Sequence, residues 1–196
     1  MASAGRIRKE IEDLKNDKAS GISVIVDPFN PKHLTGTLKG PDDTPYAGGT
    51  FEVDIVIPED YPFSPPKMKF NTKVWHPNVS SVTGAICLDI LKDQWSPALT
   101  MKTAMLSLQA LMCSPEPNDP QDAVVATMYK ERQEEFVRTA KFWTENYAKP
   151  STEGAPMHPT VRKLVDMGFP EEACKKALLD CNGDENAAVE VLLSSM

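Results

Sequence analysis

One cysteine stands in a short polar segment that could carry covalent chemistry. Cys87 lies within "HPNVSSVTGAICLDI", residues 76–90, where a polar loop runs into an apolar turn. A thiol has an ordinary pKa of about 8.5, so a cysteine that hydrolyses a bond needs a neighbouring histidine to take its proton. The chain has three histidines: His33 in a strand-like region, His158 far along the chain, and His76, whose following proline confines its backbone to extended geometry. None is placed persuasively as that base, and His76 stays open.

Composition and charge narrow the classes of function. A net charge of -7 and a pI near 5.0 argue against a general nucleic-acid or anionic-membrane surface, because such partners require clustered positive charge. No apolar run approaches the ~20 residues of a membrane-spanning helix, and the first residues show no hydrophobic signal core, so we expect a location in the cytoplasm or nucleus. Four cysteines without a CxxC pair or zinc spacing predict reduced thiols, no metal site and no cofactor.

The first half of the chain predicts one helix and an antiparallel sheet. Ile7, Ile11 and Leu14 are spaced by four and three residues, which indicates an amphipathic helix that ends before Gly21. Four short runs of β-branched and apolar residues follow, separated by Gly, Pro and Asp clusters: "ISVIVD", "HLTGTLKG", "GTFEVDIVIP" and "KMKF". They are typical of an antiparallel meander. The alternation in the third run gives the sheet one buried face, which a helix must cover.

The segments after the sheet predict a rigid loop and three helices. "YPFSPP" is rich in proline, which fixes φ and removes amide donors, so it is a loop rather than a central strand. An apolar stripe then marks a helix that Thr100 caps and that is the best candidate to cover the sheet. The stripe consists of Met101, Met105, Leu108 and Met112. Two further helices are predicted in "AVVATMYKERQEEFVRTAKFWTENYA".

A change of composition near residue 149 divides the chain. Residues 149–157, "KPSTEGAPM", are rich in Pro, Gly, Ser and Thr, which is typical of a linker. Residues 158–196 then contain three short helical patterns, at 161–165, 173–179 and 187–193. Three helices in so short a segment make a marginal but feasible bundle. The sequence therefore predicts an α+β domain over residues 1–148, a linker, and a small helical bundle.

Several motifs together resemble a known family. The triplet "HPN", the cysteine in "ICLDI", the "YPFSPP" loop and a tryptophan eight residues after the cysteine resemble the catalytic core of ubiquitin-conjugating enzymes over roughly residues 4–148. In the tail, "MGF" followed by a terminal di-leucine helix resembles a ubiquitin-associated (UBA) domain. Core, linker and UBA domain in this order are similar to the type K members of the family, which build polyubiquitin chains. The resemblance implies an α+β fold with a four-stranded antiparallel sheet packed on helices.

The resemblance implies a transferase in which Cys87 carries ubiquitin as a thioester. An activating enzyme would supply the acyl group from its own cysteine in an ATP-dependent cascade, so thiol replaces thiol and no base is needed. A lysine of a substrate or of ubiquitin then attacks the thioester through a tetrahedral oxyanion, which a positioned amide donor stabilises by ~3 kcal/mol. By resemblance that donor is Asn78, which also has a structural interpretation as an ordering residue of the loop. Asp119 would position the incoming lysine, and His76 would support the loop by hydrogen bonding.

The resemblance also implies two binding surfaces. Activating enzyme and ligases would share one of them, so that the enzyme is not recharged while a ligase is bound; it comprises Arg6, Lys9, Phe63, Ser96, Pro97 and Ala98. The tail would present a weak apolar patch to the hydrophobic face of ubiquitin, made of Met167, Gly168, Phe169, Leu192 and Leu193. We expect Phe169 and one of the two leucines to close the small core of the bundle as well. A tether raises the effective concentration at such a weak site.

One departure from the family's pattern and three alternatives stay open. The segment "VSSVTGAI" between Asn78 and Cys87 is one residue longer than in many members, and we expect the extra residue to bulge outward near Ser80 and Ser81. A pure binding module is disfavoured because Cys87, Asn78 and Asp119 are all retained. The core alone weakly disfavours a different ubiquitin-like modifier, whereas the UBA tail favours ubiquitin. A cysteine hydrolase is disfavoured because its base and its orienting partner are missing.

Overall fold

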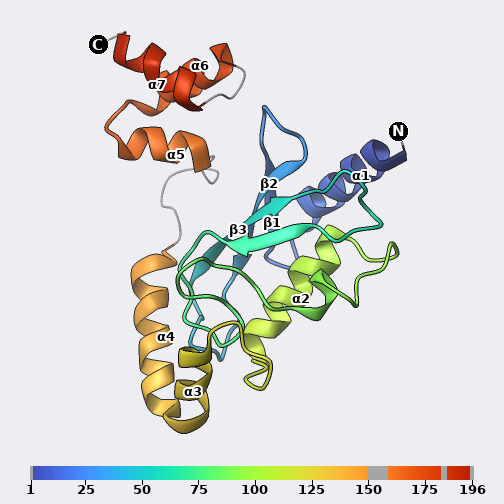
Figure 1. The fold of residues 1–196 in the computed structure, drawn as a ribbon, viewed down its shortest axis with the longest axis vertical. Coiled ribbons are helices and arrows are strands. Elements are labelled where there is room, and N and C mark those ends of the chain that lie inside the picture. Colours follow the sequence, from blue (N-terminus) through green and yellow to red (C-terminus); the bar gives the residue numbers. More distant parts are fainter. Residues whose placement is uncertain (1, 150–158, 182–184, 195–196) are drawn as a thin grey trace.

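The chain folds into an α+β domain followed by a small helical bundle (Figure 1). The structure is a computed structural model, and it describes residues 2–149, 159–181 and 185–194. The domain begins with α1 (Ala2–Asn16) and continues into a four-stranded sheet. The strands are β1 (Ser23–Val26), β2 (His33–Lys39), β3 (Thr50–Val56) and β4 (Lys67–Phe70), in the order β1-β2-β3-β4 with all neighbours antiparallel. The meander predicted from the sequence is confirmed.

One face of the sheet is buried against α2 (Met101–Cys113). Phe51, Val53 and Ile55 on β3 point to this face and are fully buried, whereas Glu52 and Asp54 alternate with them on the outer face. The predicted stripe on α2 is buried as well and consists of Met101, Met105, Leu108 and Met112. Each such side chain contributes about 1.5–3 kcal/mol when it is removed from water, so this layer is the main source of the domain's stability.

Gly36 on β2 allows α2 to approach the sheet closely. A Cβ atom at this position would lie 2.9 Å from Ile55 Cδ1 and 2.9 Å from Met105 Cε. A larger residue at this position would therefore have to displace the ends of the Ile55 and Met105 side chains. The start of α2 is fixed as predicted, because the Thr100 hydroxyl accepts a hydrogen bond from the Thr103 amide at 3.2 Å.

Three further elements complete the domain. The 3-10 turn η1 (Asp89–Leu91) follows the cysteine loop, and α3 (Ala123–Glu131) packs against α4 (Gln133–Tyr147). The Asp122 carboxylate caps α3 by accepting from the Val125 amide at 3.2 Å. Beyond α4, the Ala148 carbonyl accepts from the Thr50 amide at 2.8 Å, which ties the end of the domain to β3. The two helices predicted in this segment are confirmed.

The tail forms the predicted three-helix bundle. Its helices are α5 (Pro159–Asp166), α6 (Glu171–Asp180) and α7 (Glu185–Ser194). Their apolar faces share a small core that is separate from that of the domain and includes Val161, Leu164, Phe169, Cys174, Leu178, Ala188 and Leu192. Of the predicted linker, residues 149–157, all but Lys149 lie outside the described residues.

The bundle contacts the domain at the outer face of the sheet. On α5, Arg162 donates two hydrogen bonds to the Glu52 carboxylate of β3, with Nη1–Oε2 and Nη2–Oε1 distances of 2.9 and 2.8 Å. Phe29, in the connection between β1 and β2, packs against the apolar cluster of the bundle. A bidentate pair of this kind fixes orientation as well as distance. In the described ranges, the bundle and the domain therefore meet through this ion pair and through the ring of Phe29.

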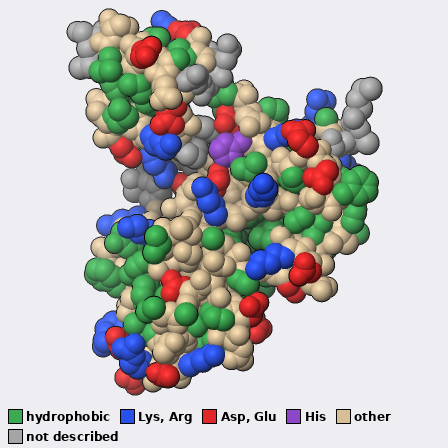
Figure 2. Space-filling view, in the orientation of Figure 1, with side chains coloured by type: hydrophobic (Ala, Val, Ile, Leu, Met, Phe, Trp, Pro, Cys, Tyr) green, Lys and Arg blue, Asp and Glu red, His purple; other side chains and the backbone are tan. Residues whose placement is uncertain are grey.

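Charges of both signs are mixed over the surface. Figure 2 shows Lys and Arg side chains interspersed with Asp and Glu on the visible face of both parts of the chain. Within the described ranges, no helix is long and apolar enough to cross a membrane. Among the same residues, no group of three or more His, Cys, Asp or Glu is arranged to hold a metal ion. All four cysteines are free thiols.

Candidate active site

His76 opens the cysteine loop and is fully buried. Its Nδ1 accepts a hydrogen bond from the Asn78 amide at 3.0 Å, and its Nε2 donates to the Leu111 carbonyl at 3.0 Å. Burial lowers the pKa of the imidazole to about 4, although the hydrogen bond to Leu111 acts in the opposite direction. A neutral ring with both nitrogens engaged is not available to take the proton of Cys87. Its place in the structure is that of a loop support.

The segment between Asn78 and Cys87 is a short hairpin. The Cys87 amide donates to the Asn78 carbonyl at 2.9 Å, and Val79 and Ile86 form an antiparallel bridge. Gly84 has a φ of +73°, and a Cβ atom there would lie 2.0 Å from a backbone carbonyl oxygen of the neighbouring β4 strand. No other residue fits this position. The hairpin therefore fixes the spacing of Asn78 and Cys87.

The exposed apex of this hairpin is Val82, one residue beyond the predicted bulge at Ser80 and Ser81. Val82 is 90% exposed. Ser81, in contrast, donates its amide and its hydroxyl to the Asp122 carboxylate, at 3.1 and 2.6 Å. Because that carboxylate also caps α3, Ser81 is anchored, and the chain turns outward at the next residue. The exposed apex therefore follows Ser81, because Asp122, which lies far along the sequence, anchors that serine.

Asn78 is buried and holds the loop that carries Asp119. Its Nδ2 donates to the carbonyls of Glu116 and Asp119, both at 2.9 Å. Its Oδ1 accepts from the Glu116 amide at 2.8 Å. Both N–H donors of the side-chain amide are thus engaged by one turn of backbone. The sequence left two roles open for Asn78, one structural and one as an oxyanion donor. These bonds show the structural role directly.

The sulfur of Cys87 lies at the surface between a carboxylate and an amine. Sγ is 3.4 Å from Asp119 Oδ2 and 3.2 Å from Lys92 Nζ. Among the described residues, the ring nitrogens of His76 are engaged as stated above, and those of His33 face carboxylates of the sheet region. The Cys87 thiol therefore has a proton acceptor in the Asp119 carboxylate and a positive charge nearby in the Lys92 ammonium. No imidazole among the described residues is available to take its proton.

Lys92 also belongs to this site, although it was not predicted from the sequence. After η1 the backbone turns back, and the Lys92 amide donates to the Asp89 carbonyl at 2.9 Å. This turn brings a side chain five positions along the chain beside the sulfur of Cys87. The signal in the sequence is slight, namely one lysine that ends the short apolar run after the cysteine in "CLDILK". Cys87, Asn78 and Asp119, by contrast, were predicted together and are brought together.

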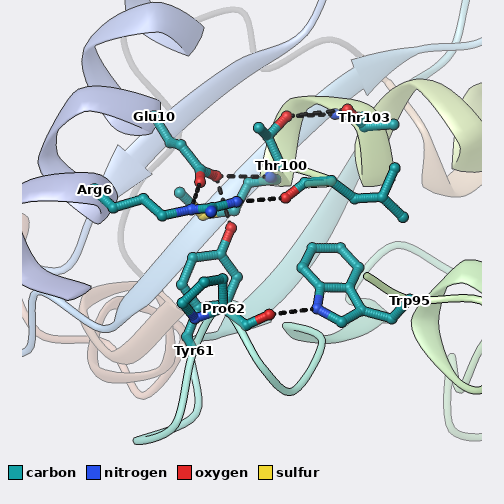
Figure 3. Close-up of polar contacts among 9 residues, drawn as sticks. Arg6, Glu10, Tyr61, Pro62, Trp95, Thr100 and Thr103 are labelled. Carbon is teal, nitrogen blue, oxygen red and sulfur yellow. Dashed lines mark hydrogen bonds and ion pairs between the residues drawn. The ribbon is translucent and has the colours of Figure 1, made fainter. Parts of the chain in front are cut away.

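A buried carboxylate joins the elements that were predicted to meet partners (Figure 3). Glu10 on α1 accepts from the Tyr61 hydroxyl at 2.7 Å and from the Met101 amide at 2.8 Å. It also pairs with Arg6 Nε at 2.7 Å. A second nitrogen of Arg6 donates to the Leu99 carbonyl at 2.6 Å. Arg6, a predicted docking residue, is therefore engaged within the molecule, where it links α1 to the start of α2.

The other predicted docking residues are exposed. Phe63 is 79% exposed on the proline-rich loop. This loop is held from two sides, because Tyr61 bonds to Glu10 and Trp95 Nε1 donates to the Pro62 carbonyl at 2.8 Å (Figure 3). The remaining exposed members of the set are Lys9, Ser96, Pro97 and Ala98. An exposed phenyl ring on an anchored loop is suited to contact with another protein.

The residues of the bundle predicted to bind ubiquitin divide into two groups. Met167 and Leu193 are each 60% exposed, and Gly168 between the first two helices is exposed too. Phe169 and Leu192 are buried in the core of the bundle. This matches the expectation that Phe169 and one leucine close the core. The surface open to a ligand therefore consists of Met167, Gly168 and Leu193.

Known sequences match both parts of the chain. The family profile described as "Ubiquitin-conjugating enzyme" matches residues 6–144, and that of the UBA/TS-N domain matches residues 160–192. The chain is 54% identical over 196 residues to "Ubiquitin-conjugating enzyme E2 27" of Arabidopsis thaliana, a match that covers 100% of both chains. It is 48% identical over 193 residues to "Ubiquitin-conjugating enzyme E2 K" of Homo sapiens, covering 97% of this chain and 96% of that protein.

Two solved structures share the fold of the domain. The ubiquitin conjugating enzyme E2 domain from Toxoplasma gondii is 55% identical, with a TM-score of 0.71 over 74% of this chain and 99% of that chain. A putative ubiquitin conjugating enzyme from Plasmodium yoelii is 52% identical, with a TM-score of 0.74 over 76% of this chain and 97% of that chain. These matches confirm the predicted fold class. The chain therefore belongs to the ubiquitin-conjugating enzymes, transferases that use a thioester intermediate, and it carries a C-terminal UBA domain.

Proposed function

We propose that this enzyme carries ubiquitin as a thioester on Cys87 and transfers it to lysines of substrates or of ubiquitin, thereby building polyubiquitin chains. The observation that carries the proposal is the surface position of the Cys87 sulfur, 3.4 Å from the Asp119 carboxylate and without an available imidazole in the described ranges. A cysteine hydrolase pairs its thiol with an imidazole, which takes the thiol proton and later protonates the leaving group. A carrier that exchanges one thioester for another needs no such imidazole, so the site favours transfer over hydrolysis.

Loading is a thiol–thioester exchange with the activating enzyme. The Cys87 thiolate attacks the acyl carbon, and the thiolate of the activating enzyme leaves, so one C–S bond replaces another. The reaction is nearly balanced in energy for that reason. The ammonium of Lys92, 3.2 Å from Sγ, supplies a positive charge next to the attacking sulfur. Asp119 is in contact with the thiol and can accept its proton.

Transfer to a lysine passes through a tetrahedral oxyanion. The incoming ammonium has an ordinary pKa near 10.4 and must lose a proton before it attacks, and Asp119 positions it beside the thioester. Asn78 keeps the Asp119 loop in place and, in our proposal, turns one Nδ2–H from a loop carbonyl to the oxyanion, a contact that stabilises it by ~3 kcal/mol. His76 holds the Asn78 backbone through its ring and takes no proton.

Partners would meet the catalytic domain at one shared surface. It would consist of the exposed Phe63, the loop Ser96–Ala98 and Lys9 on α1. Arg6 would act indirectly, because its pairing with Glu10 holds these elements together. Activating enzyme and ligases would therefore bind in turn. The domain boundaries proposed for this arrangement are 1–148 for the core, 149–157 for the linker and 158–196 for the UBA domain, in a protein of the cytoplasm or nucleus.

The UBA domain would hold ubiquitin of the growing chain. Met167, Gly168 and Leu193 form its exposed apolar face, and this face stays open while Arg162 is bound to the sheet. A weak site suffices because tethering raises the local concentration of the bound ubiquitin. The expected consequence is that chain elongation depends on the tail more than the first loading step does.

Loading is tested on a non-reducing gel with activating enzyme, ATP and ubiquitin. The wild-type chain should gain one ubiquitin that a thiol reductant removes. Cys87→Ala should gain none, whereas Cys113→Ala, which removes another exposed cysteine, should load like the wild type. A wild-type chain that never acquires a reductant-labile ubiquitin, or a Cys87→Ala chain that still does, would contradict the proposal.

Transfer is tested by mixing the preformed thioester with free lysine under single-turnover conditions. Asn78→Ala should slow discharge by about 100-fold, the usual loss when one oxyanion donor is removed, and should slow loading far less. Equal slowing of the two steps would remove the oxyanion role and leave Asn78 as a tie for the Asp119 loop.

A further inference from the structure

A pair of hydrogen bonds clamps the hairpin of Cys87 to the loop that carries Asp119. Ser81 donates its amide and its hydroxyl to Oδ2 of Asp122, at 3.1 and 2.6 Å. The other oxygen of this carboxylate accepts from the Val125 amide at the start of α3. Burial acts to raise the pKa of Asp122, but the bonds from Ser81 and from the first turn of α3 outweigh it and lower the pKa. The carboxylate is therefore ionised at neutral pH and accepts all of these bonds.

The loop from Asp119 to Asp122 is also attached to the base of the hairpin. The Asp119 carbonyl accepts from Asn78 Nδ2 at 2.9 Å. The amides of Gln121 and Asp122 both donate to the Pro77 carbonyl, at 2.9 and 3.0 Å. Contacts at the base alone would let the loop swing about that point. The clamp is a further attachment nearer to the apex of the hairpin, so it fixes the orientation of the loop as well as its distance.

The hairpin connects the clamp to the reacting sulfur. Its two limbs are bonded to each other, since the Ser80 amide donates to the Ala85 carbonyl at 2.8 Å. The first limb carries Ser81 and the second ends at Cys87, so a shift of one limb moves the other. The sulfur lies 3.4 Å from Oδ2 of Asp119. The clamp therefore holds both members of this pair, one through the hairpin and one through the loop.

We propose that Ser81 and Asp122 are positioning residues for lysine transfer, because the clamp between them holds the Asp119 carboxylate beside the thioester on Cys87. The inference rests on the proposed function, in which Asp119 positions the incoming lysine. A misplacement of reacting groups by about 1 Å can cost about 100-fold in rate. Loss of the clamp leaves the attachments at the base of the hairpin in place, so the expected loss is smaller, about tenfold.

The alternative is a clamp that only stabilises the domain by capping α3. The choice of acceptor separates the two roles. Lysine arrives as an ammonium and depends on the Asp119 carboxylate, whereas hydroxylamine is uncharged at neutral pH and attacks a thioester without such help. A clamp that acts through Asp119 should therefore matter for lysine and hardly for hydroxylamine. A purely structural clamp should affect both acceptors alike.

The experiment charges the full chain with activating enzyme, ATP and a ubiquitin that lacks lysines. After ATP is removed, free lysine or hydroxylamine is added and the loss of the reductant-labile adduct is followed at neutral pH. Ser81→Ala should slow discharge to lysine about tenfold and discharge to hydroxylamine by less than about twofold. Ser81→Thr keeps the hydroxyl and should restore the rate. Thr83→Ala removes another hydroxyl of the hairpin and should discharge like the wild type.

Two further variants make the test specific to Asp119. In an Asp119→Ala background, Ser81→Ala should have little further effect on discharge to lysine, because the carboxylate that it would misplace is absent. Asp122→Asn keeps an oxygen to cap α3, but its amide group then faces the Ser81 amide, so it should resemble Ser81→Ala.

Three results would overturn the inference and leave the proposed function standing. They are wild-type discharge to lysine in both Ser81→Ala and Asp122→Asn, equal slowing with lysine and hydroxylamine, and equal slowing with and without Asp119. Absence of any reductant-labile ubiquitin on the wild type would instead overturn the inference together with the proposed function.

Discussion

His76 shows how the loop beside Cys87 depends on a ring that must stay neutral. The side chain is fully buried, its Nδ1 accepts from the Asn78 amide, and protonation there would break that bond. Burial lowers the pKa of the ring to about 4, below its ordinary value of 6.5. The unfolded chain therefore binds more protons than the folded one between these two values, and stability is lost as the pH falls through this window.

The expected pH dependence of His76 is measurable by denaturant unfolding. Moving from about pH 7 to about pH 5 should cost about 2 kcal/mol of unfolding free energy through this residue, and about 3 kcal/mol by pH 4. His76→Gln keeps one donor and one acceptor but cannot titrate. It should be less stable at pH 7 and should not show this loss of unfolding free energy as the pH falls. The control His33→Gln, which removes another imidazole, should still show the loss. If the unfolding free energy falls equally with pH in the wild type and in His76→Gln, His76 is not the cause of the loss.

The residues of the site could be predicted from the sequence where they belong to a recognisable motif. Cys87, Asn78 and Asp119 come from segments far apart in the sequence, and the resemblance to a family was what grouped them. The contacts of these side chains could not be predicted from the sequence. For example, the bonds of Asn78 to the Glu116 turn depend on how two loops pack. Lys92 was not identified because its contact with the sulfur depends on a single backbone turn.

The elements that we propose to face partners owe their relative positions to Glu10. Its carboxylate joins α1, the loop that carries Tyr61, and the first amide of α2 (Figure 3). Hydrogen bonds to a buried charged group contribute about 1.5–3 kcal/mol each, so this network holds the loop firmly. Its position was readable in the sequence, since Glu10 follows Ile7 by three residues and precedes Leu14 by four, on the buried stripe. A charged residue on an otherwise apolar stripe indicates that its side chain forms hydrogen bonds or an ion pair inside the protein.

Phe63 should act in binding and not in folding. Its ring is 79% exposed while the loop beneath it is anchored by other residues, so Phe63→Ala should change the unfolding free energy by less than about 0.5 kcal/mol. The same change should weaken the stimulation of thioester discharge by a ligase, measured against unstimulated discharge. Phe142→Ala is the matched control, because this phenylalanine is 58% exposed on α4, away from the proline-rich loop. Full stimulation of Phe63→Ala would remove this ring from the docking surface.

Helices and strands were predictable because their apolar periods are regular. The two-residue alternation of β3 and the apolar stripe on α2 each indicate which face is buried, and those faces are buried in the structure. The hairpin apex at Val82 could not be placed to the residue from the sequence, since a loop has no period and a distant carboxylate anchors the neighbouring Ser81. Periodicity thus predicts the layers, while long-range polar bonds decide the loops.

In the described ranges, the domain and the bundle are joined by a surface ion pair and by the ring of Phe29, so salt should weaken their association. The Arg162–Glu52 pair is bidentate, yet the Arg162 side chain is 44% exposed and the pair is therefore screened by solvent and salt. Phe29 adds one apolar contact. Such an interface contributes on the order of 1 kcal/mol from its ion pair. The sequence did not reveal it, because a single arginine in the tail has no spacing that points to a strand residue.

Reversing the charge of Arg162 should release the UBA domain from the sheet. Arg162→Glu places a carboxylate opposite Glu52, so the pair becomes repulsive and no longer favours the docked state. In the full chain, amide nitrogen relaxation should then give a shorter rotational correlation time for α5–α7 than for the core. The wild type should give more similar times at low salt, and these should diverge as salt screens the pair.

The double variant Arg162→Glu with Glu52→Arg restores the attraction with reversed polarity and should bring the two correlation times together again. Lys176→Glu makes the same change of charge at an exposed position on α6 and should leave the times as in the wild type. Because Met167 and Leu193 are exposed in the docked arrangement, ubiquitin should bind the tail of Arg162→Glu as well as that of the wild type. Equal correlation times in Arg162→Glu and wild type would show that this ion pair does not hold the UBA domain on the sheet.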